Sequence, residues 1–138
     1  WKSLGLRPVI VGGRAEATLA EALMGLNSEV PWVNWTGRGS PAALWRLFRN
    51  ARCSLVNESG LAHLSSLCGS KTFIVVGAAD PSRTAPVGPG PCRIVTHQPS
   101  CWPCERNDCR NMGADYLKCL DLISVNEVSR LIEQSLEL

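Results

Sequence analysis

The fold of this chain is decided by the stretch Val56-Asn57-Glu58-Ser59-Gly60-Leu61-Ala62-His63. The apolar run that ends at Val56 is typical of a short buried strand, and apolar side chains from Leu61 onward recur at the spacing of a helix. A strand that passes through a turn of small residues into a helix is the building unit of open α/β folds. The stretch therefore predicts an α/β domain.

Strands and helices alternate on both sides of this stretch. We expect strands at residues 8–11, 30–35, 53–56, 72–76 and 93–96, and helices at 15–25, 41–48, 60–68 and 124–136. Residues 72–76 are apolar on both faces, as a central strand of a parallel sheet is. Residues 77–92, rich in proline and glycine, are expected to be a loop. The pattern predicts one Rossmann-like, doubly wound parallel sheet in a single domain, residues 1–138.

Three serines mark expected helix starts. Ser40 is followed by Pro41, a residue favoured at the first position of a helix. Ser124 and Glu127 have the spacing of a capping box. Ser59 precedes Gly60 and is expected to cap the helix after the third strand.

The composition excludes several classes of protein. Of the 138 residues, 45% are hydrophobic and 19% are charged, so we expect a packed core and no general disorder. The formal net charge of +2 is too small for a nucleic-acid-binding surface. No apolar run approaches the roughly 20 residues that span a bilayer, and Trp1–Pro8 does not resemble a signal peptide. The expected location is the cytoplasm.

The turn at Ser59-Gly60 is also the strongest candidate for a binding site. Free backbone N–H groups and the dipole at a helix start favour an anion such as phosphate, and His63 lies one turn further on. The alternative is that Ser59 is only a cap and His63 an ordinary helix residue. Two more strand ends carry small residues, at Gly77 and at Gly12-Gly13 followed by Glu16. Together, the three strand ends favour an anionic ligand.

Four of the seven cysteines crowd into one segment, and they are Cys101, Cys104, Cys109 and Cys119. The pattern C-x2-C-x4-C-x9-C could hold a structural Zn²⁺ through four thiolates, although its later spacings match no standard zinc ribbon. The alternatives are reduced thiols packed against the last helix, or two disulfides formed during preparation. Cys53, Cys68 and Cys92 are expected to be small buried hydrophobes.

Several segments in unbroken order, from about residue 4 to 136, match a known family. They are Val9-Ile10-Val11-Gly12-Gly13-Arg14-Ala15-Glu16, Asn34-Trp35-Thr36-Gly37 with Ser40 and Leu44, Glu58-Ser59-Gly60-Leu61-Ala62-His63, Val76-Gly77, and Cys119-Leu120-Asp121-Leu122-Ile123 with Val128. The series resembles the carboxyl-terminal domain of the glycosyltransferase family 9 heptosyltransferases.

The resemblance implies the GT-B architecture, in which two Rossmann-like halves face each other across a cleft. This chain would be the carboxyl half, which binds a nucleotide-sugar donor, typically ADP-heptose. An amino-terminal half would hold the lipid A–core acceptor and the catalytic aspartate. The implied function is an inverting glycosyltransferase of lipopolysaccharide core synthesis that needs no cofactor. It would work in the cytoplasm, including the inner face of the inner membrane, and the isolated chain would be inactive.

The resemblance also assigns roles to single residues. The donor-contacting positions are Glu16, near the ribose, and Glu58, Ser59, Gly60, His63 and Gly77, near the diphosphate and sugar. Glu58 stands where the family has aspartate, and Ala78-Ala79 replaces a Pro-Thr pair. The family's first strand of this half, with its lysine, has no counterpart, and Trp1–Leu6 resembles a helix tail. We therefore expect a fragment of a longer protein.

Two other functions fit the same sequence. The chain could be a zinc-stabilised module whose cysteine segment, residues 100–119, contacts a partner protein. It could instead be a degenerate family member without transferase activity, as the changes at Glu58 and Ala78-Ala79 suggest. Nucleotide binding would distinguish the interaction module from the enzyme.

Overall fold

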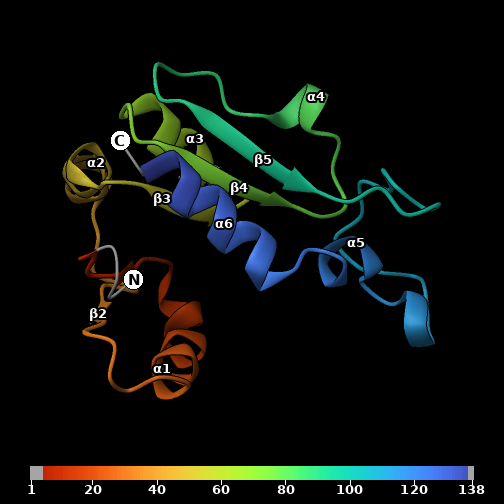
Figure 1. The fold of residues 1–138 in the computed structure, drawn as a ribbon, viewed down its shortest axis with the longest axis horizontal. Coiled ribbons are helices and arrows are strands. Elements are labelled where there is room, and N and C mark those ends of the chain that lie inside the picture. The colour runs from red at the N-terminus through yellow and green to blue at the C-terminus, as the bar shows by residue number, and fades with distance from the viewer. Residues whose placement is uncertain (1–4, 137–138) are drawn as a thin grey trace. The chain divides into compact units, whose positions relative to one another are not determined.

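A computed structural model describes residues 5–136 (Figure 1). They form two compact units, one that ends at Leu44 and one that begins at Trp45. Most of the helix tail expected at Trp1–Leu6 lies outside the described residues, and Gly5 and Leu6 belong to no helix. No helix in the described part of the chain is long and apolar enough to cross a membrane.

The first unit contains a pair of short parallel strands. β1 (Val9–Ile10) pairs with β2 (Val33–Asn34), with Val9 opposite Val33. Between them, the expected helix begins as a 3-10 turn, η1 (Arg14–Glu16), and continues as α1 (Ala17–Gly25). The boundary between the units falls within α2 (Pro41–Asn50).

The second unit is a three-stranded parallel sheet with helices on both faces. The strands are β3 (Ser54–Asn57), β4 (Thr72–Val76) and β5 (Cys92–Thr96), in the order β3-β4-β5. The helices are α3 (Gly60–Leu67), α4 (Pro81–Thr84), the 3-10 turn η2 (Gly113–Asp115), α5 (Lys118–Asp121) and α6 (Val125–Leu136). All five described strands are parallel as expected, but their hydrogen bonds form one sheet in each unit instead of a single sheet.

β4 is buried on both faces, and its alternating side chains build two cores. Phe73 packs with Val95 of β5 and with Val128 and Ile132 of α6. Ile74 and Val76 face the other way and pack with Ala62 of α3. Figure 1 shows α6 crossing in front of the sheet and α3 behind it. The expectation that 72–76 is a central strand is therefore confirmed.

Two of the three expected serine caps are present. The Ser40 hydroxyl accepts a hydrogen bond from the Ala43 N–H at 3.2 Å, and the Ser124 hydroxyl accepts one from the Glu127 N–H at 3.1 Å. Ser59 occupies the cap position of α3, but its side chain makes no capping hydrogen bond. The expected cap position of Ser59 is therefore confirmed, but the side-chain hydrogen bond of a cap is absent.

The segment 77–92 is not entirely a loop, because it contains the short helix α4. The Asp80 carboxylate accepts a hydrogen bond from the Ser82 N–H at 2.9 Å, and Pro81 occupies the first helical position. An aspartate followed by proline is a helix-start signal that a proline-rich and glycine-rich composition conceals.

The segment that leads into β5 crosses the carboxyl end of α3. There it passes very close to the backbone between Ser66 and Ser70. The Gly90 N–H donates to the Ser66 carbonyl at 3.1 Å, and the Thr72 N–H donates to the Pro91 carbonyl at 2.9 Å. A Cβ at Gly90 would lie 2.9 Å from the Gly69 carbonyl carbon and still closer to the Ser70 carbonyl oxygen. Only glycine fits between these backbone atoms.

Replacing Gly90 with alanine should lower the free energy of unfolding by about 1–3 kcal/mol, because the added methyl group displaces a packed backbone. Urea denaturation followed by circular dichroism measures the change. The control is Gly60→Ala in the same unit, where a Cβ meets no atom within 4 Å, and its stability should be unchanged or slightly higher. Equal stability losses in the two variants would contradict the packing at Gly90.

Candidate functional site

The joint between β3 and α3 lies at the carboxyl edge of the sheet, where open α/β folds bind their ligands. β3 ends at Asn57, Ser59 has an extended backbone, and α3 begins at Gly60. The Ser59 hydroxyl donates to the Asn57 carbonyl at 3.4 Å and so leaves the helix start uncapped. Within residues 5–136, the N–H groups of Gly60 and Leu61 donate to no protein acceptor.

The backbone of this joint favours an anion. Unpaired N–H groups and the dipole of α3 place partial positive charge at its first turn. His63 is exposed one turn further along, and Ser59 and Glu58 are half-buried. An exposed histidine on a first turn can hydrogen-bond a phosphate, although the same arrangement also occurs without a ligand.

A second segment reaches the joint from α4. The Thr84 hydroxyl donates a hydrogen bond to the Glu58 carboxylate, across 26 positions of sequence, and lies 3.0 Å from the Asp80 carbonyl oxygen. The sequence-based interpretation missed Thr84, because no local pattern connects it to Glu58. Thr84 brings a hydroxyl to this edge from α4, and its proton is donated to Glu58.

Gly77 follows β4 at the same edge, because Val75 pairs with Asn57 in the neighbouring strand. A Cβ at Gly77 would lie 2.9 Å from the Leu120 side chain and 3.5 Å from the Cys119 sulfur. The missing side chain therefore makes room for α5. We expected the missing side chain at Gly77 to allow a ligand to approach the backbone. The space that a Cβ would occupy is instead next to α5.

Glu16 lies in the first unit. Its carboxylate folds back over the turn after β1 and accepts a hydrogen bond from the Gly13 N–H. The side chain is exposed. The structure thus groups five of the six expected donor-contacting residues in the second unit and places Glu16 in the other.

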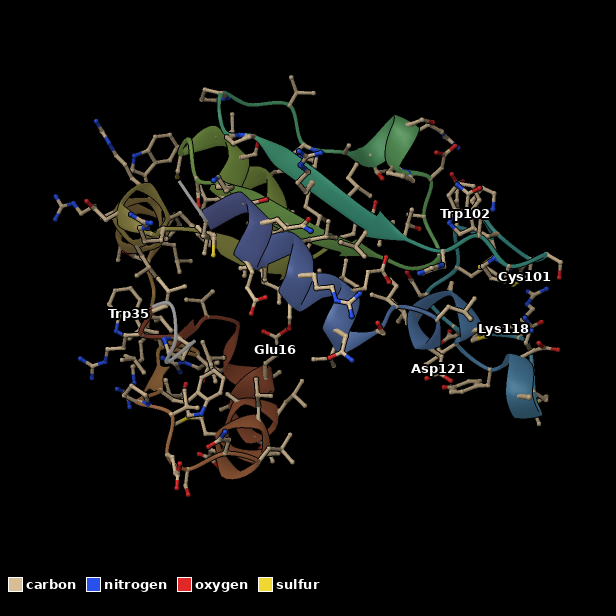
Figure 2. The ribbon with its side chains drawn as sticks, in the orientation of Figure 1. Glu16, Trp35, Cys101, Trp102, Lys118 and Asp121 are labelled. Atoms are coloured by element: carbon tan, nitrogen blue, oxygen red, sulfur yellow. The ribbon has the colours of Figure 1, made fainter. Side chains whose placement is uncertain are left out.

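The four clustered cysteines line one cavity of about 170 Å³, together with Ala78 at the end of β4. Figure 2 shows Cys101, Trp102 and Lys118 in the part of the second unit towards which β4 and β5 point. Burial raises the pKa of the Cys119 thiol, and the neighbouring Cys104 and Cys101 raise it further. Among the described residues, no three histidine, cysteine, aspartate or glutamate side chains already stand in a metal-coordinating arrangement.

The chain resembles solved glycosyltransferase structures. It aligns with the glycosyl transferase family 9 structure from Veillonella parvula DSM 2008 with a TM-score of 0.75 and 19% identity, over 97% of this chain and 37% of that one. It aligns with E. coli ADP-heptose lps heptosyltransferase II with a TM-score of 0.66 and 20% identity, over 92% of this chain and 36% of that one. No protein-family model and no curated protein matches the sequence.

These comparisons confirm the predicted fold class, an α/β domain with parallel strands that corresponds to part of a GT-B glycosyltransferase. The structural neighbours include the family that the sequence segments resemble. The chain spans a little over a third of each neighbour's length, 37% and 36%.

The cap of α4 should depend on the charge of Asp80. Hydrogen bonds from the Ser82 side chain and backbone hold the pKa of Asp80 below its ordinary value of 3.8. A lowered pKa means that the stabilisation is complete above pH 3.8 and is lost as the pH falls through the folded-state pKa. Hydrogen exchange should show Ser82 losing protection below pH 3.8 in the natural chain.

The matched variants are Asp80→Ala, which should expose the Ser82 N–H at every pH, and Asp80→Asn, which keeps an acceptor without a charge. In Asp80→Asn the protection of Ser82 should not change with pH. Equal protection in Asp80→Ala and the natural chain would show that the carboxylate does not cap α4.

Proposed function

We propose that this chain is the donor-binding, carboxyl-terminal half of a heptosyltransferase-like enzyme of glycosyltransferase family 9. The observation that carries the proposal is the uncapped start of α3 at the carboxyl edge of a sheet whose fold matches glycosyltransferases. The proposed donor is a nucleotide sugar, ADP-heptose. The proposed acceptor is the lipid A–core, held by an amino-terminal half.

The diphosphate is the part of the donor that the α3 start suits best. Two free N–H groups, on Gly60 and Leu61, and the helix dipole favour its negative charge. His63 adds a hydrogen bond that strengthens as charge builds on the leaving diphosphate. We propose that these groups stabilise the departing nucleotide, with no cofactor required at this half.

Glu58 and Thr84 form the side of the joint that would face the sugar. The hydrogen bond from Thr84 fixes one oxygen of the Glu58 carboxylate and leaves the other able to accept from a sugar hydroxyl. Glutamate is one methylene longer than the aspartate of the family pattern, and the contact with α4 holds this longer side chain in place. Glu16 is proposed to accept from the ribose of the donor, by resemblance alone.

Transfer would need a base that removes the proton of the acceptor hydroxyl as it attacks the sugar carbon and inverts its configuration. We assign that base to the amino-terminal half. The proposed role of this chain is therefore to bind the donor and to stabilise its leaving group.

A second candidate is a family member that binds the nucleotide but does not transfer sugar. The hydrogen bond between Thr84 and Glu58 favours it, because a carboxylate engaged by the protein is less available to a substrate. Both candidates predict nucleotide binding. They differ in whether the longer protein turns over ADP-heptose.

ADP should bind to the chain in a manner that depends on His63. Titration calorimetry should show binding that His63→Ala weakens about tenfold or more, the loss expected for one hydrogen bond to a charged group. The control is His97→Ala, which removes the other histidine, a residue whose ring lies 3.1 Å from Glu127 of α6. Identical titration curves for the natural chain and His63→Ala would remove His63 from the site.

The chain by itself should transfer no sugar, because we assign the catalytic base to the other half. The assay supplies ADP-heptose and a lipid A–core acceptor and measures release of ADP. Mixing the chain with a separately produced amino-terminal half tests for recovery of activity. Turnover by the purified chain alone would contradict the assignment of the base.

A further inference from the structure

The segment between β5 and α6 has limited hydrophobic packing, which includes Ile123 against the core beneath α6 and Leu120 beside Gly77. No residue from Thr96 to Glu127 is buried, and η2 and α5 are each a single short turn. Its polar links include the Glu105 N–H, which donates to the Ala78 carbonyl at 2.9 Å just after β4, and an exposed ion pair of Glu105 with Arg83 of α4 at 2.6 Å. Such contacts offset only a small part of the entropy lost when a segment is ordered.

The cysteines in this segment do not behave as small core residues. Cys53 and Cys92, elsewhere in the unit, are also half-buried, but they pack against the two hydrophobic cores. Cys101 is exposed, and Cys104, Cys109 and Cys119 are half-buried around the cavity. Because free cysteine is normally among the most buried residue types, packing alone does not explain four of them around one cavity.

The backbone and side chains around the cavity direct N–H groups at two of the sulfurs. The Asn111 side-chain amide lies 3.3 Å from the Cys101 sulfur, and the Leu117 N–H lies 3.4 Å from the Cys109 sulfur. Leu117 has a left-handed backbone with φ of 51°, a conformation that costs a leucine about 1–2 kcal/mol. N–H donors of this kind orient metal-bound ligands and tune their basicity.

The charges around the cavity also suit a thiolate cluster. Arg106, Arg110 and Lys118 line it, and Lys118 pairs with Asp115 at 2.7 Å. Four thiolates around one divalent cation carry about two negative charges in excess. Since Asp115 also lines the cavity and pairs with Lys118, the two arginines are the charges that offset that excess, and they would offer nothing to neutral thiols.

We propose that Cys101, Cys104, Cys109 and Cys119 bind one structural Zn²⁺, which fixes the segment 97–122 at the carboxyl end of β4. A Zn–S distance of about 2.3 Å requires the four sulfurs to move inward and to fill the cavity. The absence of buried side chains in this segment permits that movement. The metal then holds α5 so that Leu120 and Cys119 stay packed at Gly77. A structural zinc site would hold whether or not the chain binds a nucleotide sugar.

The test begins with the natural chain purified under reducing conditions, saturated with zinc and freed of excess metal. Elemental analysis should find about one zinc per chain. Alkylation followed by peptide mass mapping should show that zinc protects Cys101, Cys104, Cys109 and Cys119, and that a chelator exposes them. The labelling of Cys53, Cys68 and Cys92 should not respond to zinc. This comparison uses only the natural sequence, so it remains valid if a variant fails to fold.

Serine variants supply the matched comparison. Cys101→Ser and Cys119→Ser should each lose tight zinc binding, whereas Cys68→Ser, a half-buried cysteine outside the cavity, should keep it. Chelation should increase hydrogen exchange in residues 97–122 and leave β3 and β4 protected.

Three outcomes would overturn the zinc site. The first is a chain that retains no zinc, with the four thiols equally reactive with and without it. The second is iron in place of zinc. The third is a mass lower by about two hydrogens per bridge under the same reducing conditions, which would show disulfides resistant to reduction.

Discussion

The second unit depends on the burial of β4 between two layers of helix. The side chain of Phe73 packs against α6, and that of Ile74 packs against α3. Both are almost entirely buried, with 0% and 1% of their surface exposed. Burial of side chains of this size contributes roughly 1.5–3 kcal/mol each. Because β3 and β5 both pair with β4 in parallel, this strand also fixes the edge at which all three strands end.

That edge brings together segments that are far apart in the sequence. The joint after β3 supplies the free N–H groups at Gly60 and Leu61, and α4 supplies the hydroxyl of Thr84 that reaches Glu58. The cysteine segment lies against the end of the next strand, where Leu120 occupies the space beside Gly77. The proposed nucleotide site and the proposed zinc site therefore lie at the carboxyl ends of neighbouring strands, and α4 connects them through the ion pair between Arg83 and Glu105.

Much of this could be predicted from the sequence, because it depends on local chemistry. The apolar run 72–76 indicated a central strand, and the serines at 40 and 124 located the starts of α2 and α6. The family resemblance predicted the fold class that the structural neighbours share. The roles of the six donor-contacting residues and of the four cysteines stay predictions.

The sequence by itself determined where the strands and the longer helices form, because burial periodicity and cap residues act over a few neighbouring positions. Only the tertiary structure decided what each polar group contacts. In the folded chain the Ser59 hydroxyl donates to a carbonyl instead of capping α3, and Thr84 donates to Glu58. Leu120 fills the space beside Gly77. Such contacts depend on how elements separated by tens of residues pack against one buried strand, and no local pattern encodes that arrangement.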